Sequence, residues 1–233
     1  MRKILIVNDD GIESEGLIRL AKAATRFGEV YVVAPDGQRS AVSHSITLRH
    51  SFEAWECDFP VPGVKAYACD GTPADCARIG ILNLVPGGPD NVFSGINYGY
   101  NCATDLQYSA TAGAAFEAAF QGINTIAFSE EATECHEATD KYLEEVIEAL
   151  IDKSLDRIRI WNVNFPARAE GILWNRTVAE EHFYKDRYAM KEVKSGRYSF
   201  MVDGVLQNYA SEGTDMKALL DGYVSVGVAH NIH

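Results

Sequence analysis

Apolar runs alternate with amphipathic segments along the first two thirds of the chain. Residues 3–7 read KILIV, a short and partly β-branched run of the kind that is buried on both faces of a parallel sheet. From Ser14 to Phe27, apolar residues recur at spacings of three and four and end at Gly28, which predicts an amphipathic helix. A second apolar run at 29–34 completes a strand–helix–strand unit, whose crossover should be right-handed.

The same alternation continues to residue 165. Further strands are expected at 64–69, 90–94, 124–129 and 159–165, and further helices at 73–83, 109–121 and 136–153. This order of elements is typical of an α/β fold with a doubly wound, mainly parallel sheet. We therefore expect residues 1–172 to form one α/β core.

The pattern changes after residue 172. Short strand-like runs at 177–179, 188–193, 198–202 and 223–228 are separated by polar and glycine-containing breaks, and a brief helix is expected from residue 213. We predict that residues 173–233 form a β-hairpin extension. Because hairpin edges can pair with another chain, this extension is expected to take part in oligomerisation.

Polar residues follow the first strand directly, as Asn8-Asp9-Asp10-Gly11. In a turn, which Gly11 permits, Asp9 and Asp10 can share a partner that they could not share within a strand. Two carboxylates held close repel each other, and one takes up a proton unless a cation lies between them. The pair is therefore a candidate divalent-metal site, and a solvated turn is the simpler alternative.

Other polar segments are expected at the same edge of the sheet, where ligands bind in open α/β folds. The loop at 38–45 follows the second strand, and a glycine- and asparagine-containing loop at 95–101 follows the strand at 90–94. Asn97 in that loop offers a neutral oxygen suited to a hard cation. Ser109 and Thr111 open a helix whose N-terminus can bind phosphate, although both residue types also serve as ordinary helix caps.

Charge and cysteine content limit the classes of partner. A net charge of −12 argues against binding to duplex nucleic acid or to an anionic membrane. The same charge would repel a phosphorylated substrate, unless a bound cation reversed the local field. No apolar run approaches the roughly 18 residues of a membrane helix. The five cysteines are odd in number and scattered, which suits reduced thiols and a cytoplasmic protein.

Six sequence blocks, taken in order, resemble one known family. They are Asn8–Gly11, Ala34–Asp36 with Arg39-Ser40, Gly71–Cys76, Ser94–Asn97, Tyr108–Thr111 and Asn162–Pro166. Together they resemble the SurE survival-protein family, metal-dependent 5′/3′-nucleotidases that cleave nucleoside monophosphates. The resemblance runs nearly the whole chain, and its first and fourth blocks are the most specific.

The resemblance implies a Rossmann-like core, a C-terminal segment exchanged between subunits, and a homodimer or homotetramer. The family's metal ligands fall on Asp9, Asp10, Ser40 and Asn97, and its phosphate-contacting segment falls on Ser109 and Thr111. This all-oxygen set suits one Mg²⁺ or Mn²⁺ per subunit and does not suit zinc.

The expected reaction is hydrolysis of a nucleoside monophosphate by a metal-activated water. Asp9 and Asn97 are the expected catalytic residues, Asn8 and Gly95 are expected to contact the substrate beside them, and Tyr98 and Tyr100 are candidates for contacting the base. Two alternatives remain open. Asp9 could act as a covalent nucleophile, or the chain could be a nucleotide-binding or sensing module without catalysis.

This sequence also departs from the family pattern. Ala103 and Ala110 stand where glycine is usual, and His44 replaces a more usual asparagine. The chain ends at His233, whereas many members continue with another helix. These differences concern substrate fit and subunit assembly more than the metal site.

Overall fold

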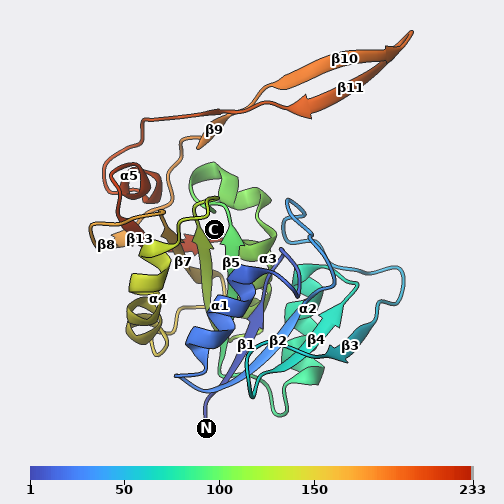
Figure 1. Ribbon diagram of the computed structural model, residues 1–233, viewed down its shortest axis with the longest axis vertical. Coiled ribbons are helices and arrows are strands. Elements are labelled where there is room, and N and C mark those ends of the chain that lie inside the picture. The colour runs from blue at the N-terminus through green and yellow to red at the C-terminus, as the bar shows by residue number, and fades with distance from the viewer. Residues whose placement is uncertain (232–233) are drawn as a thin grey trace.

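The computed structural model describes residues 1–231, so the chain end at His233 lies outside the described part. A nine-stranded sheet with the order β3-β4-β2-β1-β5-β6-β7-β13-β8 forms its centre (Figure 1). The strands of this sheet are β1 (Lys3–Val7), β2 (Glu29–Pro35), β3 (Ala54–Cys57), β4 (Lys65–Cys69), β5 (Asn91–Tyr98), β6 (Asn124–Glu130), β7 (Arg159–Phe165), β8 (Ile172–Arg176) and β13 (Val224–His230).

Helices connect most of these strands. They are α1 (Glu15–Ala24), α2 (Pro73–Ile79), the π-helix η1 (Gly80–Leu84), the 3₁₀-helix η2 (Ala103–Tyr108), α3 (Ala110–Phe120), α4 (Glu137–Leu150) and α5 (Asp215–Leu220). Strands β4, β2, β1, β5, β6 and β7 run parallel to one another, whereas β3 and β13 are antiparallel to β4 and β7. The predicted strand and helix alternation is therefore confirmed.

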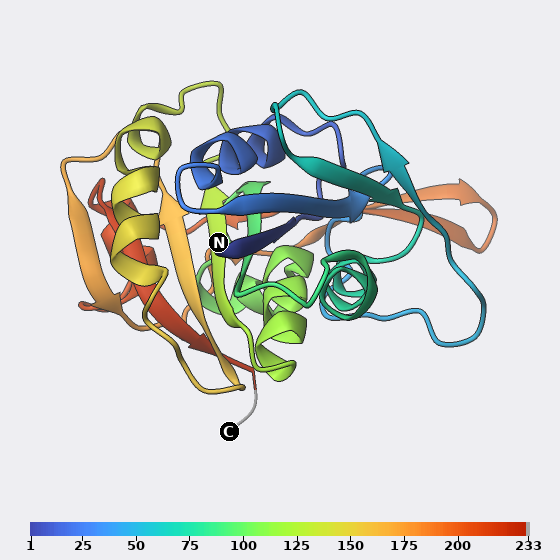
Figure 2. The same ribbon diagram turned by 90° about the horizontal axis from the view of Figure 1, so that it is seen from below.

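The two faces of the sheet are covered by different helices. Figure 2 shows α1 and α4 on one side and α2 and α3 on the other. Leu17 and Leu20 of α1 and Val146 of α4 pack in one apolar cluster, and Ala77 of α2 and Ala114 of α3 pack in a second. Both clusters rest on fully buried strand residues, as a doubly wound parallel sheet requires.

The start of α2 confirms the predicted capping of that helix. Thr72 Oγ1 accepts a hydrogen bond from the Asp75 N–H, and the Asp75 carboxylate accepts one from the Thr72 N–H. Asp75 also accepts hydrogen bonds from the N–H of Thr47 at 3.0 and 3.2 Å. The cap thus fixes the far end of the loop that follows β2.

Two local predictions are wrong. Residues 95–98, expected in a loop, continue β5 because Asn97 and Tyr98 pair with Ser129 and Glu130 of β6 beyond a bulge. Residues 177–179, expected as a strand, contribute only an isolated bridge at Thr177, and the strand there is β8. In both cases pairing with a distant strand decides the outcome, which short-range patterns do not register.

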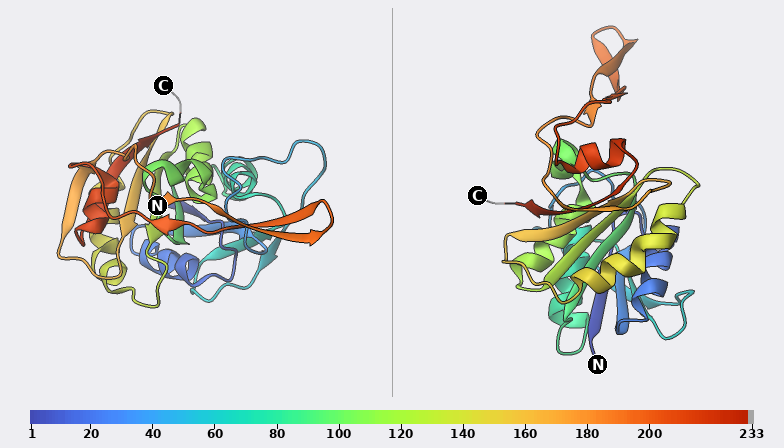
Figure 3. Two further views of the ribbon diagram at one scale, coloured as in Figure 1. Left: turned by 90° about the horizontal axis from the view of Figure 1, so that it is seen from above. Right: turned by 90° about the vertical axis from the view of Figure 1, so that its left-hand side faces the viewer.

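The C-terminal residues divide between the main sheet and a projecting arm. Strand β13 inserts between β7 and β8, whereas β10 (Tyr188–Lys194) and β11 (Arg197–Val202) form an antiparallel hairpin. A short pair, β9 (Tyr184–Lys185) and β12 (Val205–Leu206), connects the hairpin to the body. We call residues 184–206 the arm. It extends from the end of the molecule opposite the N-terminus (Figures 1 and 3). No helix within residues 1–231 is long and apolar enough to span a bilayer.

Candidate active site

The predicted site residues gather where the strand order reverses. From β1 the chain proceeds outward through β2 and β4, then returns to place β5 on the other side of β1, with Val7 opposite Ser94. Such a switch point leaves a crevice at the carboxyl ends of the two strands, because their connections leave on opposite faces of the sheet. Asp9 and Asp10 follow β1 at this point, and Asn97 lies near the end of β5.

Asp9 is buried and contacts the first turn of α3. Asp9 is only 3 % exposed. Thr111 Oγ1 donates a 2.5 Å hydrogen bond to Asp9 Oδ1. Burial raises the pKa of Asp9 from 3.8 to about 7, and the neighbouring Asp10 charge adds to the rise, while the Thr111 hydrogen bond opposes it. Without a cation, the site therefore disfavours the ionised Asp9.

Asp10 joins the end of β1 to the end of β5. Its Oδ2 accepts a hydrogen bond of 3.0 Å from the backbone N–H of Tyr98. Burial raises the pKa of Asp10, and hydrogen bonds from Tyr98 and from the Gln38 side chain partly offset that effect. Two adjacent carboxylates are thus both held in surroundings that favour their neutral forms.

The loop after β2 brings Ser40 to the same edge. The N–H of Arg39 donates to the Asp9 carbonyl oxygen at 2.7 Å, which places the loop beside Asp9. Gln38 Nε2 donates to Ser40 Oγ at 3.1 Å, and Ser40 is exposed. Gln38 was not among the predicted site residues, although its position in the polar loop after β2 was a usable signal.

Asn97 and Gly95 occupy the irregular end of β5. Asn97 Nδ2 donates to the Gly99 carbonyl at 2.7 Å, and no described group donates to its Oδ1. Gly95 has φ +134°, and a Cβ there would lie 2.2 Å from the Phe128 carbonyl oxygen. This close approach of β5 to β6 is a structural reason for the glycine, separate from the predicted substrate contact.

Asn8 and Ser109 also have structural partners. Asn8 is buried and donates through Nδ2 to the Gly11 carbonyl at 3.0 Å and to Ser14 Oγ at 2.8 Å, which shapes the turn that holds both aspartates. Ser109 is the N-cap of α3, where its Oγ accepts from the Ala112 N–H at 3.0 Å. The N–H groups of Ala110 and Thr111 precede the first intrahelical hydrogen bond and lie at the end of α3 that contacts Asp9.

The two tyrosines have different surroundings. Tyr98 is 54 % exposed and lines a cavity of about 280 Å³ beside Asp10. Tyr100 is partly buried, its hydroxyl donates to Glu131 Oε2 at 3.0 Å, and its ring packs edge-on against Phe183 at the base of the arm. Of the pair, Tyr98 is therefore the one available to a ligand.

Glu130 is a further residue that the sequence did not indicate. It ends β6, is 4 % exposed, and lines the same cavity as Asp10 and Tyr98. Arg19 Nη1 donates to both carboxylate oxygens of Glu130, at 2.8 and 3.0 Å. The negative charge of Glu130 contributes to the raised pKa of Asp10. Its place at the end of a strand next to β5 was the signal that could have identified it.

The donor atoms fit a hard divalent cation. Within residues 1–231 no three or more His, Cys, Asp or Glu side chains are placed to hold a metal ion. A set made of two carboxylates with neutral hydroxyl and amide oxygens is nevertheless the kind that binds Mg²⁺, which commonly takes one or two carboxylates together with water and substrate oxygens. A bound cation would compensate the charge of the ionised Asp9 and so lower its raised pKa.

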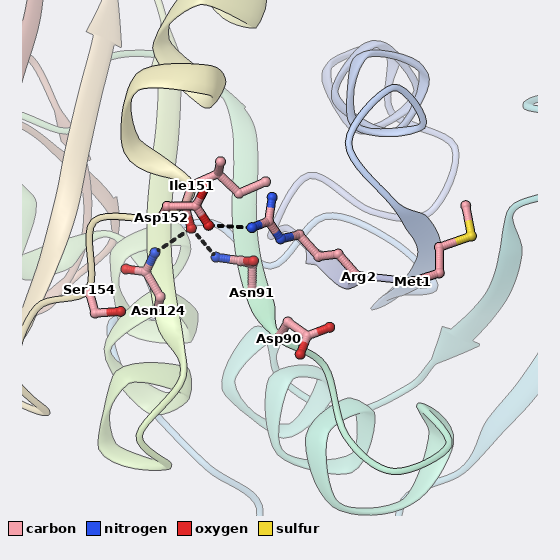
Figure 4. Close-up of a pocket in the computed structure, with 8 residues that line it drawn as sticks. All are labelled: Met1, Arg2, Asp90, Asn91, Asn124, Ile151, Asp152 and Ser154. Carbon is pink, nitrogen blue, oxygen red and sulfur yellow. Dashed lines mark hydrogen bonds and ion pairs between the residues drawn. The ribbon is translucent and has the colours of Figure 1, made fainter.

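The opposite end of the sheet holds a hollow with different chemistry. It has a volume of about 460 Å³ and lies at the starts of β1, β5 and β6. Asn91 and Asn124 donate to the Ile151 carbonyl oxygen there at 2.9 and 3.0 Å, and Arg2 pairs with Asp152 (Figure 4). These contacts cap the end of α4 and join it to the sheet, so they explain the polar residues of this hollow structurally.

Comparisons with known proteins agree with the sequence blocks and the fold. The family model of the survival protein SurE matches residues 4–185. The 5′-nucleotidase SurE of Thermosipho melanesiensis is 37% identical over 229 residues, covering 96% of this chain and 89% of the relative. The 5′-nucleotidase SurE 1 of Thermus thermophilus is 40% identical over 230 residues, covering 96% and 90% of the two chains.

A solved structure extends the agreement to three dimensions. The crystal structure of the SurE protein from Aquifex aeolicus superimposes with a TM-score of 0.83 at 33% identity, covering 98% of this chain and 93% of that one. The predicted resemblance, carried by the blocks from Asn8 to Pro166, is confirmed together with the fold that it implied. This chain therefore belongs to the SurE family.

Proposed function

We propose that this protein is a divalent-metal-dependent nucleotidase that hydrolyses nucleoside monophosphates to a nucleoside and phosphate. One observation carries the proposal: Asp9, at the switch point, is bonded to Thr111 in the first turn of α3. This contact places a candidate metal-binding carboxylate next to a helix N-terminus that can bind phosphate. Relatives at 36–40% identity that bear the name 5′-nucleotidase SurE support the same reaction class.

Asp9, Asp10, Ser40 and Asn97 would hold the cation, Mg²⁺ or Mn²⁺ by their chemistry. A bound divalent cation supplies charge stabilisation at the phosphoryl oxygens and lowers the pKa of water. The chain's own residues orient the reactants. Thr111 donates to Asp9 Oδ1 and so orients this carboxylate; with one of its oxygens on the cation, the other would accept a proton from water. The Asn97 amide is fixed by its bond to Gly99, so that its Oδ1 faces away from that carbonyl.

The N-terminus of α3 would bind the phosphoryl oxygens that do not contact the cation. The N–H groups of Ala110 and Thr111 precede the first intrahelical hydrogen bond, which Gly113 donates to Ser109 at 3.0 Å. The helix dipole favours an anion at this end. Ser109, as the N-cap, and the buried Thr111 keep this turn in position, and Asn8 and Gly95 shape the strand ends on either side.

The cavity beside Asp10 would hold the nucleoside. It adjoins a proposed metal ligand, has a volume of about 280 Å³, and includes the exposed ring of Tyr98. Aromatic rings stack on nucleobases regardless of sequence, which supports Tyr98 as the base contact. Tyr100, whose hydroxyl is bonded to Glu131, contributes to the arm's anchorage and is the weaker candidate for contacting the base.

The test is phosphate release from a panel of 5′- and 3′-nucleoside monophosphates. The protein is first treated with chelator, and then Mg²⁺, Mn²⁺ or Zn²⁺ is added back to separate samples. We expect activity to be lost with chelator and restored by Mg²⁺ or Mn²⁺. Nucleotide binding without phosphate release under any ion would instead favour a sensing module.

The arm is the proposed contact between subunits. Its hairpin carries seven exposed apolar side chains: Tyr188, Met190, Val193, Tyr198, Phe200, Met201 and Val202. A two-stranded hairpin of this kind is marginally stable alone and gains stability by packing on another surface. A homodimer or homotetramer in which residues 184–206 pack on a second subunit would provide that surface.

We assign the protein to the cytoplasm on the state of its thiols. All five cysteines are free, and Cys69, Cys76 and Cys102 are buried as thiols. Unpaired cysteines persist where thiols are kept reduced.

A further inference from the structure

We propose that Glu117 and His44 position the loop that carries Ser40, and that this pair thereby sets the cation affinity of the candidate site. We call the two residues the His44–Glu117 clamp. The inference rests on the proposed metal site, but it assigns a role to residues outside that site.

The clamp is built around a buried carboxylate. Glu117 of α3 is 5 % exposed, and its Oε2 lies 2.9 Å from His44 Nε2. A carboxylate accepts hydrogen bonds, so His44 Nε2 donates to Glu117. Asn231 Nδ2 lies 3.4 Å from the other ring nitrogen, Nδ1. The His44 ring also packs on Phe120 with its centroid 5.5 Å away.

The backbone next to His44 is pressed directly onto α3. A Cβ at Gly113 would lie 2.5 Å from the Ser43 carbonyl oxygen and 2.8 Å from the His44 Cα, so only glycine admits the loop at this distance. The Ser43 N–H donates to the Tyr108 carbonyl at 3.1 Å, and Ser43 Oγ donates to the Gln107 carbonyl at 3.0 Å. This end of the loop is thus seated on α3 and η2 together.

Ser40 lies between two anchors and has few contacts of its own. One anchor is the Arg39 N–H on the Asp9 carbonyl, and the other is the Ser43–His44 segment, which the clamp holds together with the two Ser43 hydrogen bonds. Between and beside them, Ala41 and Ser43 have φ of 57° and 53°. Residues other than glycine hold such left-handed conformations only where their surroundings impose them. Loss of the clamp would therefore remove one of the contacts that impose these conformations, and the segment that carries Ser40 would shift.

The clamp joins Ser40 to the same helix that holds Asp9. Glu117 lies further along α3 from Thr111, whose hydroxyl donates to Asp9. Through α3, two proposed ligands from separate loops are therefore held in one rigid frame. When a group that holds a metal ligand in position is removed, the metal affinity commonly falls about 10- to 100-fold.

Removal of His44 should leave the protein folded. Arg78 Nη1 lies 3.5 Å from Glu117 Oε1, and Gln121 Nε2 donates to the same oxygen at 3.2 Å. Glu117 thus keeps partners for its charge when the imidazole is absent. This makes His44→Ala a safer probe than Glu117→Ala, which would remove the carboxylate that Arg78 and Gln121 also contact.

The experiment measures Mn²⁺ binding to the full chain by titration with detection of free Mn²⁺, without substrate. The variants are His44→Ala and the conservative His44→Gln. The control is His50→Ala, which removes an exposed histidine from the same connection. We expect His44→Ala to bind Mn²⁺ about 10- to 100-fold more weakly, His44→Gln to recover most of the affinity by donating an amide N–H to Glu117, and His50→Ala to match the unaltered chain.

A second readout follows the loop itself. Amide hydrogen exchange in the metal-free protein should speed up within residues 38–45 in His44→Ala and stay unchanged elsewhere. Equal Mn²⁺ affinity in His44→Ala and the unaltered chain would overturn the inference while leaving the metal site intact. Absence of Mn²⁺ binding in the unaltered chain would overturn the metal site and the inference together. Mn²⁺ binding that depends on His44 without any phosphate release would retain the inference and reject the nucleotidase.

Discussion

Thr111 and Asp9 are 102 residues apart in the chain, and the hydroxyl of the first donates a 2.5 Å hydrogen bond to the carboxylate of the second. Thr111 is fully buried, so this bond cannot be replaced by one from bulk water. It fixes one oxygen of Asp9 and ties the end of β1 to the start of α3. The proposed metal-binding and phosphate-binding parts of the site are thus joined through a single contact.

Replacing Thr111 by Val should lower kcat for phosphate release by roughly 10- to 100-fold, because Asp9 loses the group that orients it. Thr111→Ser keeps the hydroxyl and should retain most of the activity. Steady-state kinetics with saturating Mn²⁺ measures both variants. Equal activity in Thr111→Val and the unaltered chain would show that Asp9 is oriented by other groups.

Asp9→Asn should abolish phosphate release yet stabilise the metal-free protein at alkaline pH. The folded-state pKa of Asp9, about 7, exceeds its ordinary value of 3.8. The contribution of Asp9 to stability is therefore fully present below about pH 4 and is lost as the pH rises through 7. At pH 8 the variant should gain about 4 kcal/mol, which is the rise from 3.8 to about 7 converted at about 1.4 kcal/mol per pKa unit.

Chemical denaturation in the presence of chelator measures this gain as the difference between Asp9→Asn and the unaltered chain. The difference should shrink steadily toward pH 4, because both proteins are then neutral at this position. A gain that did not depend on pH would mean that the Asp9 charge is not its source.

Gly16→Ala should destabilise the protein, although alanine in a helix is normally more stable than glycine by about 1 kcal/mol. Helix α1 lies against β5, and a Cβ at Gly16 would meet the Ile96 carbonyl oxygen at 2.2 Å. We expect a net loss of about 1–3 kcal/mol from the forced displacement. Thermal denaturation checks it, with the exposed Lys22→Ala of the same helix as the control. A higher melting temperature in Gly16→Ala would contradict the close packing.

Removal of the arm should reduce the oligomeric state without unfolding the body. The Gln207 N–H donates to the Phe183 carbonyl at 2.9 Å, so the residues on either side of the arm lie close together. Two glycines can therefore replace residues 184–206. Light scattering after gel filtration should give the monomer mass for this variant and a multiple of it for the full chain. A Phe200→Asp substitution on the exposed hairpin should weaken the association in the same direction. An unchanged mass in both variants would place the subunit contact elsewhere.

The sequence predicted most of the core because its signals there are local. Continuous apolar runs marked β1 and β2, and the Thr72–Asp75 box marked the start of α2. The polar residues after successive strands indicated a common edge, since parallel strands bring their carboxyl ends together. The same reasoning predicts that Asp9 and Asp10 lie at this edge, and the structure places both of them there.

The remaining features depend on tertiary contacts that leave no local pattern. Residues Gly95 to Tyr98 have the composition of a loop, yet pairing with β6 makes them a strand. The hydrogen bond from Thr111 to Asp9 depends on how deeply α3 packs against the sheet. The effects of Gln38 and Glu130 on the pKa of Asp10 depend on their positions beside that residue in the folded chain. Such relationships are set by the sheet order and not by residue type or spacing.

The two ends of the segment between β8 and α5 are hydrogen-bonded to each other. Thr177 donates through its N–H to the Gly213 carbonyl at 3.2 Å and accepts from the Asp215 N–H at 2.8 Å, so the chain departs from β8 and returns to α5 at one point. Residues next to these positions, such as Ala179 and Phe183, pack on the body, whereas the arm lies farther out in the segment. The length and sequence of the arm can therefore change while both ends of the segment keep their places on the body.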